Sequence, residues 1–139
     1  MNPLSGLFVL VGKYVAAGNA VRLFDEAMAF HRAGKFKEAA PLMQEAAESG
    51  YINAAAIYGS MLLLGQGVAE DGREAVKWLE HATEAGHEGA KSTLAMALVT
   101  GKGGAPRDLK RGVMLLTECA EAGDEQSQRM LEVVSARRR

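Results

Sequence analysis

The chain has 139 residues, with 16 basic and 17 acidic side chains and a formal net charge of −1. This balance argues against an overall field that attracts nucleic acid or an anionic membrane. Hydrophobic residues make up 48% of the chain but aromatic residues only 6%. Alanine supplies much of the apolar content, so we expect close-packed helices rather than a sheet, in one all-α domain over residues 1–139.

Residues 3–18 predict a helix rather than a leader or a membrane span. The unbroken apolar run Leu7–Val11 is short, and no basic residue precedes Lys13. Apolar residues recur at spacings of three, four or seven, which places them on one helical stripe: Leu4, Leu7, Phe8, Val11, Tyr14 and Val15. We expect this helix to pack on the first repeat and to end at a break formed by Gly18 and Asn19.

Residues 20–50 predict a partial repeat of two helices. The first would bury Leu23, Ala27 and Phe30 and stop at Gly34. The second resembles the second half of a tetratricopeptide repeat. Pro41 lies inside it and removes one backbone hydrogen bond, so we expect a kink or a late start there.

Residues 51–86 form the clearest unit, because residues 87–123 repeat its pattern with one inserted residue. The glycines of Gly65-Gln66-Gly67 suit the positive φ of a helix end and turn. Asp71 is expected to cap the next helix, with Glu74 completing a capping box. The expected core positions are Ala54, Tyr58, Gly59, Leu62, Ala75, Trp78, Leu79 and Ala82.

The second unit has the same features at Ala90, Leu94, Ala95, Leu98, Gly101, Gly103, Asp108, Leu115 and Gly123. Residues 124–136 then predict a closing helix, capped by Asp124, that covers the last repeat. The terminal Arg137, Arg138 and Arg139 read as a solvated tail. Nucleic acid, an acidic partner or a phosphate group are the alternatives that arginines suggest.

The run from Ala54 through Tyr58, Gly59, Leu62, Gly65, Gly67, Asp71 and Trp78 to Ala85-Gly86 resembles a Sel1-like repeat, a relative of the tetratricopeptide repeat. The resemblance implies an α/α right-handed superhelix that acts as an adaptor surface, often in bacterial signalling, envelope or secretion machinery. Some members of the family are immunity proteins against toxins. One cysteine-rich branch binds and hydrolyses penicillins, but this chain has a single cysteine and lacks the paired cysteines of that branch.

No group of residues predicts a catalytic, metal or cofactor site. His81 and His87 straddle Gly86 and do not share a helical face, so we read them as surface residues. His31 fits a packing role. Cys119 has acidic rather than basic neighbours and is expected to be a buried structural residue. The glycine turns follow helices rather than strands, which indicates structure rather than phosphate binding.

Geometry predicts a binding surface. If Ala54, Tyr58 and Leu62 face the partner helix, residues on the other side of the same helix form the concave wall, since successive residues turn by about 100°. Repeating this step along the chain also places Gly89 and Thr100 there. The candidate partner-binding residues are Arg22, Asp25, Glu26, Asn53, Ser60, Leu64, Ser92, Thr93 and Met96. A merely solvated face is the alternative.

We expect a cytoplasmic, non-catalytic interaction module that binds another protein or peptide through this wall or through the N-terminal helix. No cofactor, nucleic acid or membrane insertion is expected. An immunity protein that neutralises a toxin and a penicillin-binding or β-lactamase-like enzyme are the alternatives. A homodimer through Leu7, Phe8, Leu10 and Val11 of the N-terminal helix stays open.

Overall fold

The computed structural model describes the backbone of residues 3–139 and the side chains of residues 17–139. All regular structure in this part of the chain is helical. The elements are α1 (Pro3–Arg32), α2 (Phe36–Glu48), α3 (Ile52–Leu64), α4 (Gly72–Glu84), α5 (Glu88–Thr100), the short 3-10 helix η1 (Lys102–Gly104), α6 (Leu109–Glu121) and α7 (Glu125–Arg137).

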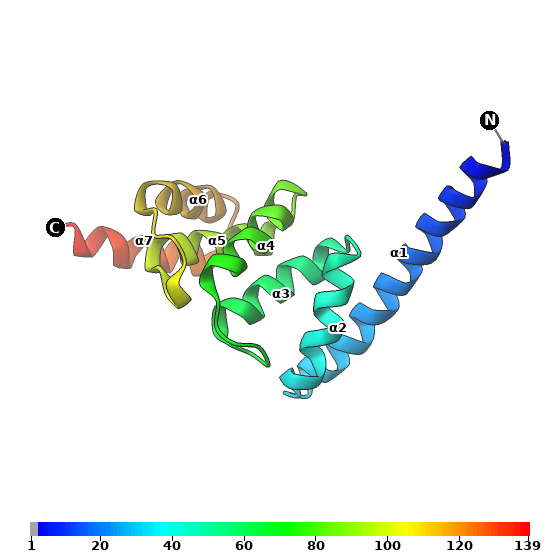
Figure 1. The fold of residues 1–139 in the computed structure, drawn as a ribbon. Helices are drawn as coiled ribbons and strands as arrows, with labels where there is room; N and C mark the ends of the chain where they lie inside the picture. Colours follow the sequence, from blue (N-terminus) through cyan, green and yellow to red (C-terminus); the bar gives the residue numbers. More distant parts are fainter. Residues whose placement is uncertain (1–2) are drawn as a thin grey trace.

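The helices form successive pairs, α1 with α2, α3 with α4 and α5 with α6, and each pair packs on the next. Helix α7 packs on α6 and is the last helix of the described residues (Figure 1). The predicted all-α helical repeat solenoid is therefore confirmed. In each pair we call α1, α3 and α5 the first helices, and α7 occupies the place of a further first helix.

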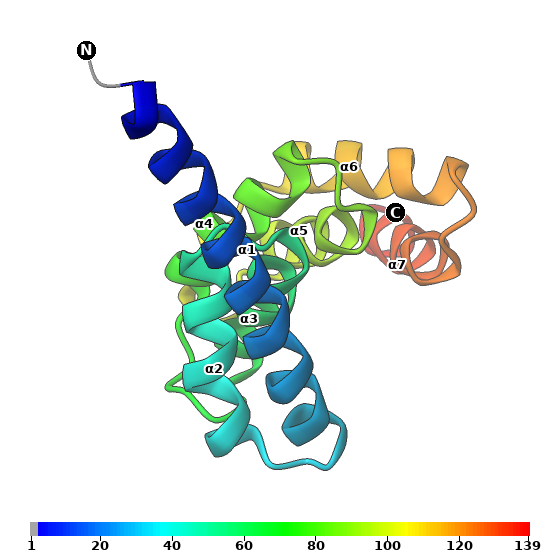
Figure 2. The ribbon, with the colours of Figure 1, turned by 90° about the vertical axis from the view of Figure 1, so that its right-hand side faces the viewer.

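Helix α1 is continuous where a break was expected. It runs through Gly18 and Asn19 to Arg32, so the predicted division into helices over 3–18 and 20–33 is wrong. One glycine costs a helix only about 1 kcal/mol relative to alanine, and packing of the second half of α1 on α2 outweighs that cost. The first half projects beyond the stack (Figures 1 and 2), and its predicted apolar stripe lies outside the described side chains.

Helix α2 begins at Phe36 and includes Pro41, so the predicted late start is wrong. Pro41 is exposed, whereas Ala40 and Met43 beside it are buried. The backbone hydrogen bond that proline removes therefore lies on the solvent side, where water can satisfy the orphaned carbonyl group.

The second helices α2, α4 and α6 share three buried positions. Two of these positions are small in every pair and one holds a larger apolar side chain. In chain order the equivalent residues are Ala39, Ala75 and Gly112; Met43, Leu79 and Leu116; and Ala46, Ala82 and Cys119. The small positions let neighbouring helices approach closely, and the larger side chains fill the space between them.

Two glycines mark the closest helix contacts. A Cβ atom added to Gly59 on α3 would lie 2.9 Å from Leu79 Cγ on α4. A Cβ atom added to Gly112 on α6 would lie 2.7 Å from Val99 Cγ2 and 3.1 Å from the Val99 nitrogen on α5. A Cβ atom would therefore force the Leu79 side chain to move at Gly59, and at Gly112 it would press on both the side chain and the backbone of Val99.

The glycine turns are structural, as the sequence predicts. Gly65 and Gly101 end α3 and α5 with φ of 66° and 67°, and each donates its N–H to a carbonyl group of the last turn. The loop after α3 lies on the first turn of α2, and the loop after α5 lies on the first turn of α4. A Cβ atom on Gly67 would be 2.1 Å from the Phe36 carbonyl oxygen, and one on Gly72 would be 2.3 Å from that of Lys102.

Aspartates begin helices α4, α6 and α7. The carboxylate of Asp71 accepts a hydrogen bond from Glu74 N at 3.1 Å, and Asp108 and Asp124 cap α6 and α7 in the same way. The predicted capping box is wrong in its second half. The Asp71 N–H donates to Leu62 O at 2.8 Å, so it is not free for the Glu74 side chain, which pairs with Lys77.

The contact at Gly112 predicts opposite effects for two glycine-to-alanine substitutions. Gly112→Ala forces its Cβ into Val99 and should lower the free energy of unfolding by about 1–3 kcal/mol. Gly18→Ala, in α1 with no heavy atom within 4 Å of the added Cβ, should raise it by about 0.5–1 kcal/mol. Urea unfolding followed by circular dichroism measures both, and a Gly112→Ala variant as stable as the parent chain contradicts the close contact.

Candidate interaction surface

Helix α3 is buried on almost every side. Eight of its residues are buried: Ala54, Ala55, Ala56, Tyr58, Gly59, Met61, Leu62 and Leu63. Beyond Ile52 in its first turn, the side chains that keep contact with solvent are those of Asn53, Ile57, Ser60 and Leu64. At about 100° per residue these four share one narrow stripe.

The same stripe recurs on α5 at the equivalent positions Gly89, Thr93, Met96 and Thr100. On α7 the equivalent residues are Gln126, Met130, Val133 and Arg137, none of which is buried. Gln126 Nε2 lies 3.7 Å from Met96 Sδ, so the stripes of α5 and α7 meet. We call these twelve residues of α3, α5 and α7 the first-helix strip.

The predicted partner-binding residues of α3 and α5 all keep contact with solvent. Asn53 and Leu64 are exposed, and Ser60, Thr93 and Met96 are half-buried within the strip, with Ser92 half-buried beside it. Ile57 was not among the predicted residues, although its position on the helix places it in the same stripe. The α7 members were missed because the frame was not carried into the closing helix.

The three predicted residues of α1, Arg22, Asp25 and Glu26, are all exposed. The buried residues Ala20 and Ala27 of the same helix lie on another side. Arg22 Nη1 is 3.4 Å from Glu26 Oε1, a solvent-exposed pair that contributes little to stability. Their role in binding stays a prediction.

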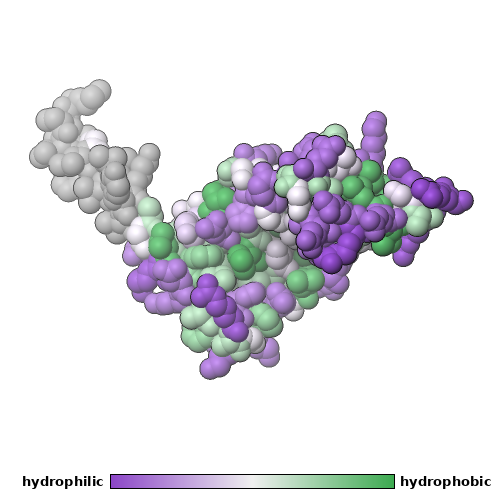
Figure 3. All heavy atoms as spheres, turned by 180° about the vertical axis from the view of Figure 1, so that it is seen from behind, coloured by the Kyte–Doolittle hydropathy of each residue, from purple (hydrophilic) through white to green (hydrophobic). Residues whose placement is uncertain are grey.

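Much of the polar chemistry on the strip is already satisfied. The hydroxyl groups of Ser60 and Thr93 donate to Ala56 O and Gly89 O at 3.1 and 3.0 Å. In contrast, Leu64 is 53% exposed and Val133 is 48% exposed, and these exposed fractions are high for large apolar side chains. On the face drawn in Figure 3, small apolar areas lie among hydrophilic ones, including near the C-terminal end. Apolar contacts are therefore what the strip offers most directly to a partner.

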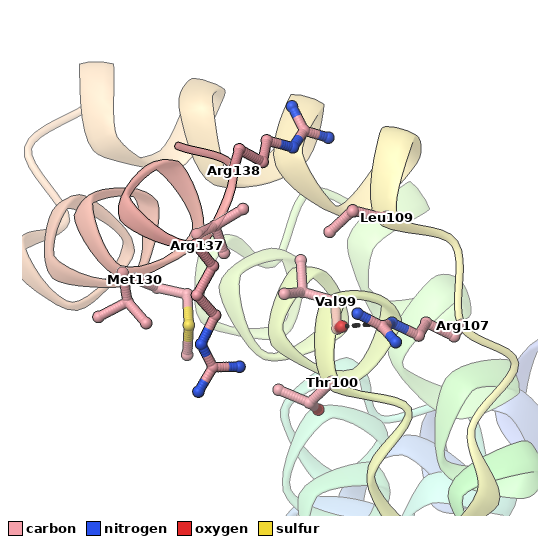
Figure 4. Close-up of a pocket in the computed structure, with 9 residues that line it drawn as sticks. Val99, Thr100, Arg107, Leu109, Met130, Arg137 and Arg138 are labelled. Atoms are coloured by element: carbon pink, nitrogen blue, oxygen red, sulfur yellow. Dashed lines mark hydrogen bonds between the residues drawn. The ribbon is translucent and has the colours of Figure 1, made fainter.

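A hollow of about 550 Å³ lies at the C-terminal end of the strip, between the end of α5, the start of α6 and α7. Its walls are mainly apolar and three arginines stand around it (Figure 4). It is lined by Val99, Thr100, Arg107, Leu109, Met130, Val133, Val134, Arg137 and Arg138. Arg107 Nε donates to Val99 O at 3.2 Å, which fixes that side chain against the wall.

His31, His87 and Trp78 serve packing and capping, whereas His81 is exposed. His31 stacks edge-on with Phe36, with ring centroids 5.1 Å apart. His87 caps α5, since its Nδ1 accepts the Ala90 N–H at 3.0 Å, a role that the sequence analysis missed. Trp78 packs edge-on against Tyr58 and lies against the core, but it is only half-buried, so its predicted burial is wrong. Within the described part of the chain, no three His, Cys, Asp or Glu side chains gather as a metal site would require.

Cys119 is buried, with 3% of its surface exposed. Burial raises the pKa of its thiol, and the nearby Lys91 lowers it by a smaller amount. Burial likewise raises the pKa of the Tyr58 hydroxyl group. Cys119 occupies the position held by Ala46 and Ala82 in the preceding pairs, so a small packing residue is what this place requires.

These features define a helical-repeat protein with a narrow solvent-exposed strip on its first helices. Residues 52–87 and 91–124, half of the chain, match the family model described as Sel1 repeat. The chain belongs to the Sel1 repeat family. Proteins of this family generally mediate protein–protein interactions and are generally non-catalytic. A search among curated proteins gives no significant match.

Three solved structures are similar. The Sel1 repeat protein from Oxalobacter formigenes has 25% identity and a TM-score of 0.66, over 88% of this chain and 96% of that one. The protective antigen c5321 of uropathogenic Escherichia coli has 22% identity and a TM-score of 0.73, over 88% of this chain but 27% of that one. Helicobacter pylori cysteine rich protein B has 16% identity and a TM-score of 0.61, over 94% and 98%.

The Cys119 environment predicts an unreactive thiol. Because its pKa is raised, less of the thiolate is present at any given pH, and burial blocks access, so alkylation by iodoacetamide at pH 8 should be slower than in the urea-unfolded chain by at least about tenfold. Mass spectrometry follows the reaction. Cys119→Ala should retain the fold, since alanine fills the equivalent positions. Equal rates in the folded and unfolded chains contradict the burial.

Proposed function

We propose that this chain recognises a polypeptide partner through the first-helix strip, as an adaptor or regulator rather than an enzyme. The observation that carries the proposal is the strip itself. Packing constrains nearly every other residue of α3, whereas Asn53, Ile57, Ser60 and Leu64 contact no neighbouring helix closely enough to be buried. Because packing does not fix the residue types at these four positions, they can differ to suit a partner.

The chemistry of the strip suits a helix or an extended peptide. Exposed Leu64 offers an apolar contact, and exposed Asn53 offers a side-chain amide at the edge of the strip. A few apolar contacts surrounded by polar groups is the arrangement that protein interfaces use at their centre and rim. Arg22, Asp25 and Glu26 would continue the strip onto α1 as a charged end.

Several further points belong to the same proposal. The chain forms one domain, with repeats over 20–50, 51–86 and 87–123 and a closing helix over 124–136. The lone cysteine suits a reducing compartment, which supports a cytoplasmic location. In the described residues, no helix has both the length and the apolar character that a membrane crossing needs. No observation on these residues favours toxin neutralisation, β-lactam hydrolysis or a homodimer through the N-terminal helix.

The strip can be tested with two matched substitutions. Leu64 and Met114 are both exposed apolar residues, at 53% and 54%, but Leu64 lies on the strip and Met114 on second helix α6. Leu64→Glu should weaken capture of a native partner by about tenfold or more, because it places a charge in an apolar contact. Met114→Glu should leave capture unchanged.

Affinity purification from the source cells, quantified by mass spectrometry with the parent chain and both variants, gives the measurement. Circular dichroism confirms that each variant is folded. A partner that is lost with Met114→Glu and retained with Leu64→Glu would place binding on the second helices, and the proposal would then be wrong.

A further inference from the structure

The hollow at the C-terminal end of the strip has a composition that sets it apart from the rest of the surface. Its apolar walls come from α5, α6 and α7, and three arginines stand around it. Among the described residues, none that lines it is acidic. We infer that this hollow binds an acidic peptide segment of the partner, with one apolar side chain of that segment seated between the helices. The inference rests on the proposed function and names the chemistry of the partner.

The hollow is part of the strip. Met130, Val133 and Arg137 of α7 occupy the positions held by Ile57, Ser60 and Leu64 on α3. Because the stripes of α5 and α7 meet at Met96 and Gln126, a segment that follows the strip along α3 and α5 can continue to the hollow. The strip is polar or mixed on the earlier helices and becomes apolar and basic here.

The apolar walls remain available for contact. Val134 is only half-buried, although the equivalent Met61 and Ala97 are completely buried. Leu109 is also half-buried, whereas the equivalent Gly72 lies beneath the loop of the next pair. An apolar side chain placed in the hollow would remove this surface from water, which is favourable in proportion to the area buried.

Helix α7 distinguishes this face from a simple end of the stack. Helix α3 packs on its second helix α4 through a side that includes Gly59 and Leu62. The equivalent residues of α7 are the charged Glu132 and the polar Ser135. Both of these side chains are exposed. The hollow side keeps Met130, Val133 and Val134, so the same helix is polar where stacking would continue and apolar where the hollow lies.

The three arginines around the hollow favour an occupant with negative charge. Arg22 and Arg111 pair with Glu26 and Glu80, whereas Arg107, Arg137 and Arg138 have no carboxylate partner among the described residues. In Figure 4 their guanidinium groups stand on different sides of the opening. Carboxylates beside a central apolar side chain would meet these groups, and charge-assisted hydrogen bonds to arginine are the stronger kind.

Nucleic acid fits the hollow less well than an acidic peptide. Single-stranded nucleic acid is held by aromatic side chains on which bases stack, and no aromatic residue is among those of the described chain that line the hollow. The aliphatic walls match an aliphatic or aromatic side chain of a peptide. The volume of about 550 Å³ lies within the range of ordinary ligand pockets.

Selection of short random peptides from a display library on the full chain tests the inference. The strongest binder is synthesised in its acidic form and with each Asp and Glu replaced by Asn and Gln, and fluorescence anisotropy measures both. We expect selected peptides to carry carboxylates on either side of an aliphatic or aromatic residue. The amide form should bind at least about tenfold more weakly.

Two double variants with equal changes in charge locate the site. Arg107→Gln/Arg138→Gln should weaken binding of the acidic peptide by at least about tenfold. Arg73→Gln/Arg139→Gln removes two exposed arginines that do not line the hollow and should change binding by less than about twofold. Val133→Asp tests the apolar wall and should also weaken binding, while thermal unfolding confirms that all variants are folded.

Several results would overturn the inference. These are selection of peptides without carboxylates, equal binding of the amide form, equal losses in the two double variants, or tighter binding of a labelled single-stranded DNA than of the peptide. A dimer that Val133→Asp converts to a monomer would show that a second copy occupies the hollow. If Leu64→Glu releases the native partner and the Arg107→Gln/Arg138→Gln variant does not, the strip stands and the inference alone is wrong.

Discussion

The structure depends on close contact between helices at small residues. Gly59 on α3 meets Leu79, and Gly112 on α6 meets Val99, at distances that leave no room for a Cβ atom. Such contacts let helices with mainly small and aliphatic side chains pack closely and exclude water. They explain how a chain with only 6% aromatic residues can form a core. They also fix where each helix lies, because the helices that meet at these glycines cannot shift without a clash.

That same constraint determines where recognition can occur. Helix α3 contacts its own second helix α4, the second helix α2 of the preceding pair, and the next first helix α5. Only one narrow side of it is left, and its residues differ from helix to helix while the packed positions stay small or apolar. The changing chemistry along the strip, from Asn53 and Ser60 to Met130 and Arg137, is therefore a consequence of packing that fixes everything else.

Local signals made much of this architecture predictable from the sequence. The glycine turns, the aspartate caps and the repeated small residues act within one helix or one turn, so their spacing is enough. The errors come from competition between local and tertiary terms. Gly18 and Asn19 favour a break, but packing on α2 keeps α1 continuous. The Asp71 N–H bonds to Leu62 across the loop, and this long-range partner displaces the expected capping box.

The hollow could not be predicted for a related reason. It joins Val99 and Leu109, on either side of a loop, to Val134 and Arg138 of α7, and only the packing of α7 on the last pair brings them together. The terminal arginines looked like a solvated tail because sequence alone gives them no neighbours. Helix α7 instead places Arg137 and Arg138 at the rim of an apolar hollow. Positive charge beside exposed apolar surface favours an acidic segment with an apolar side chain, and the earlier pairs of helices lack this combination.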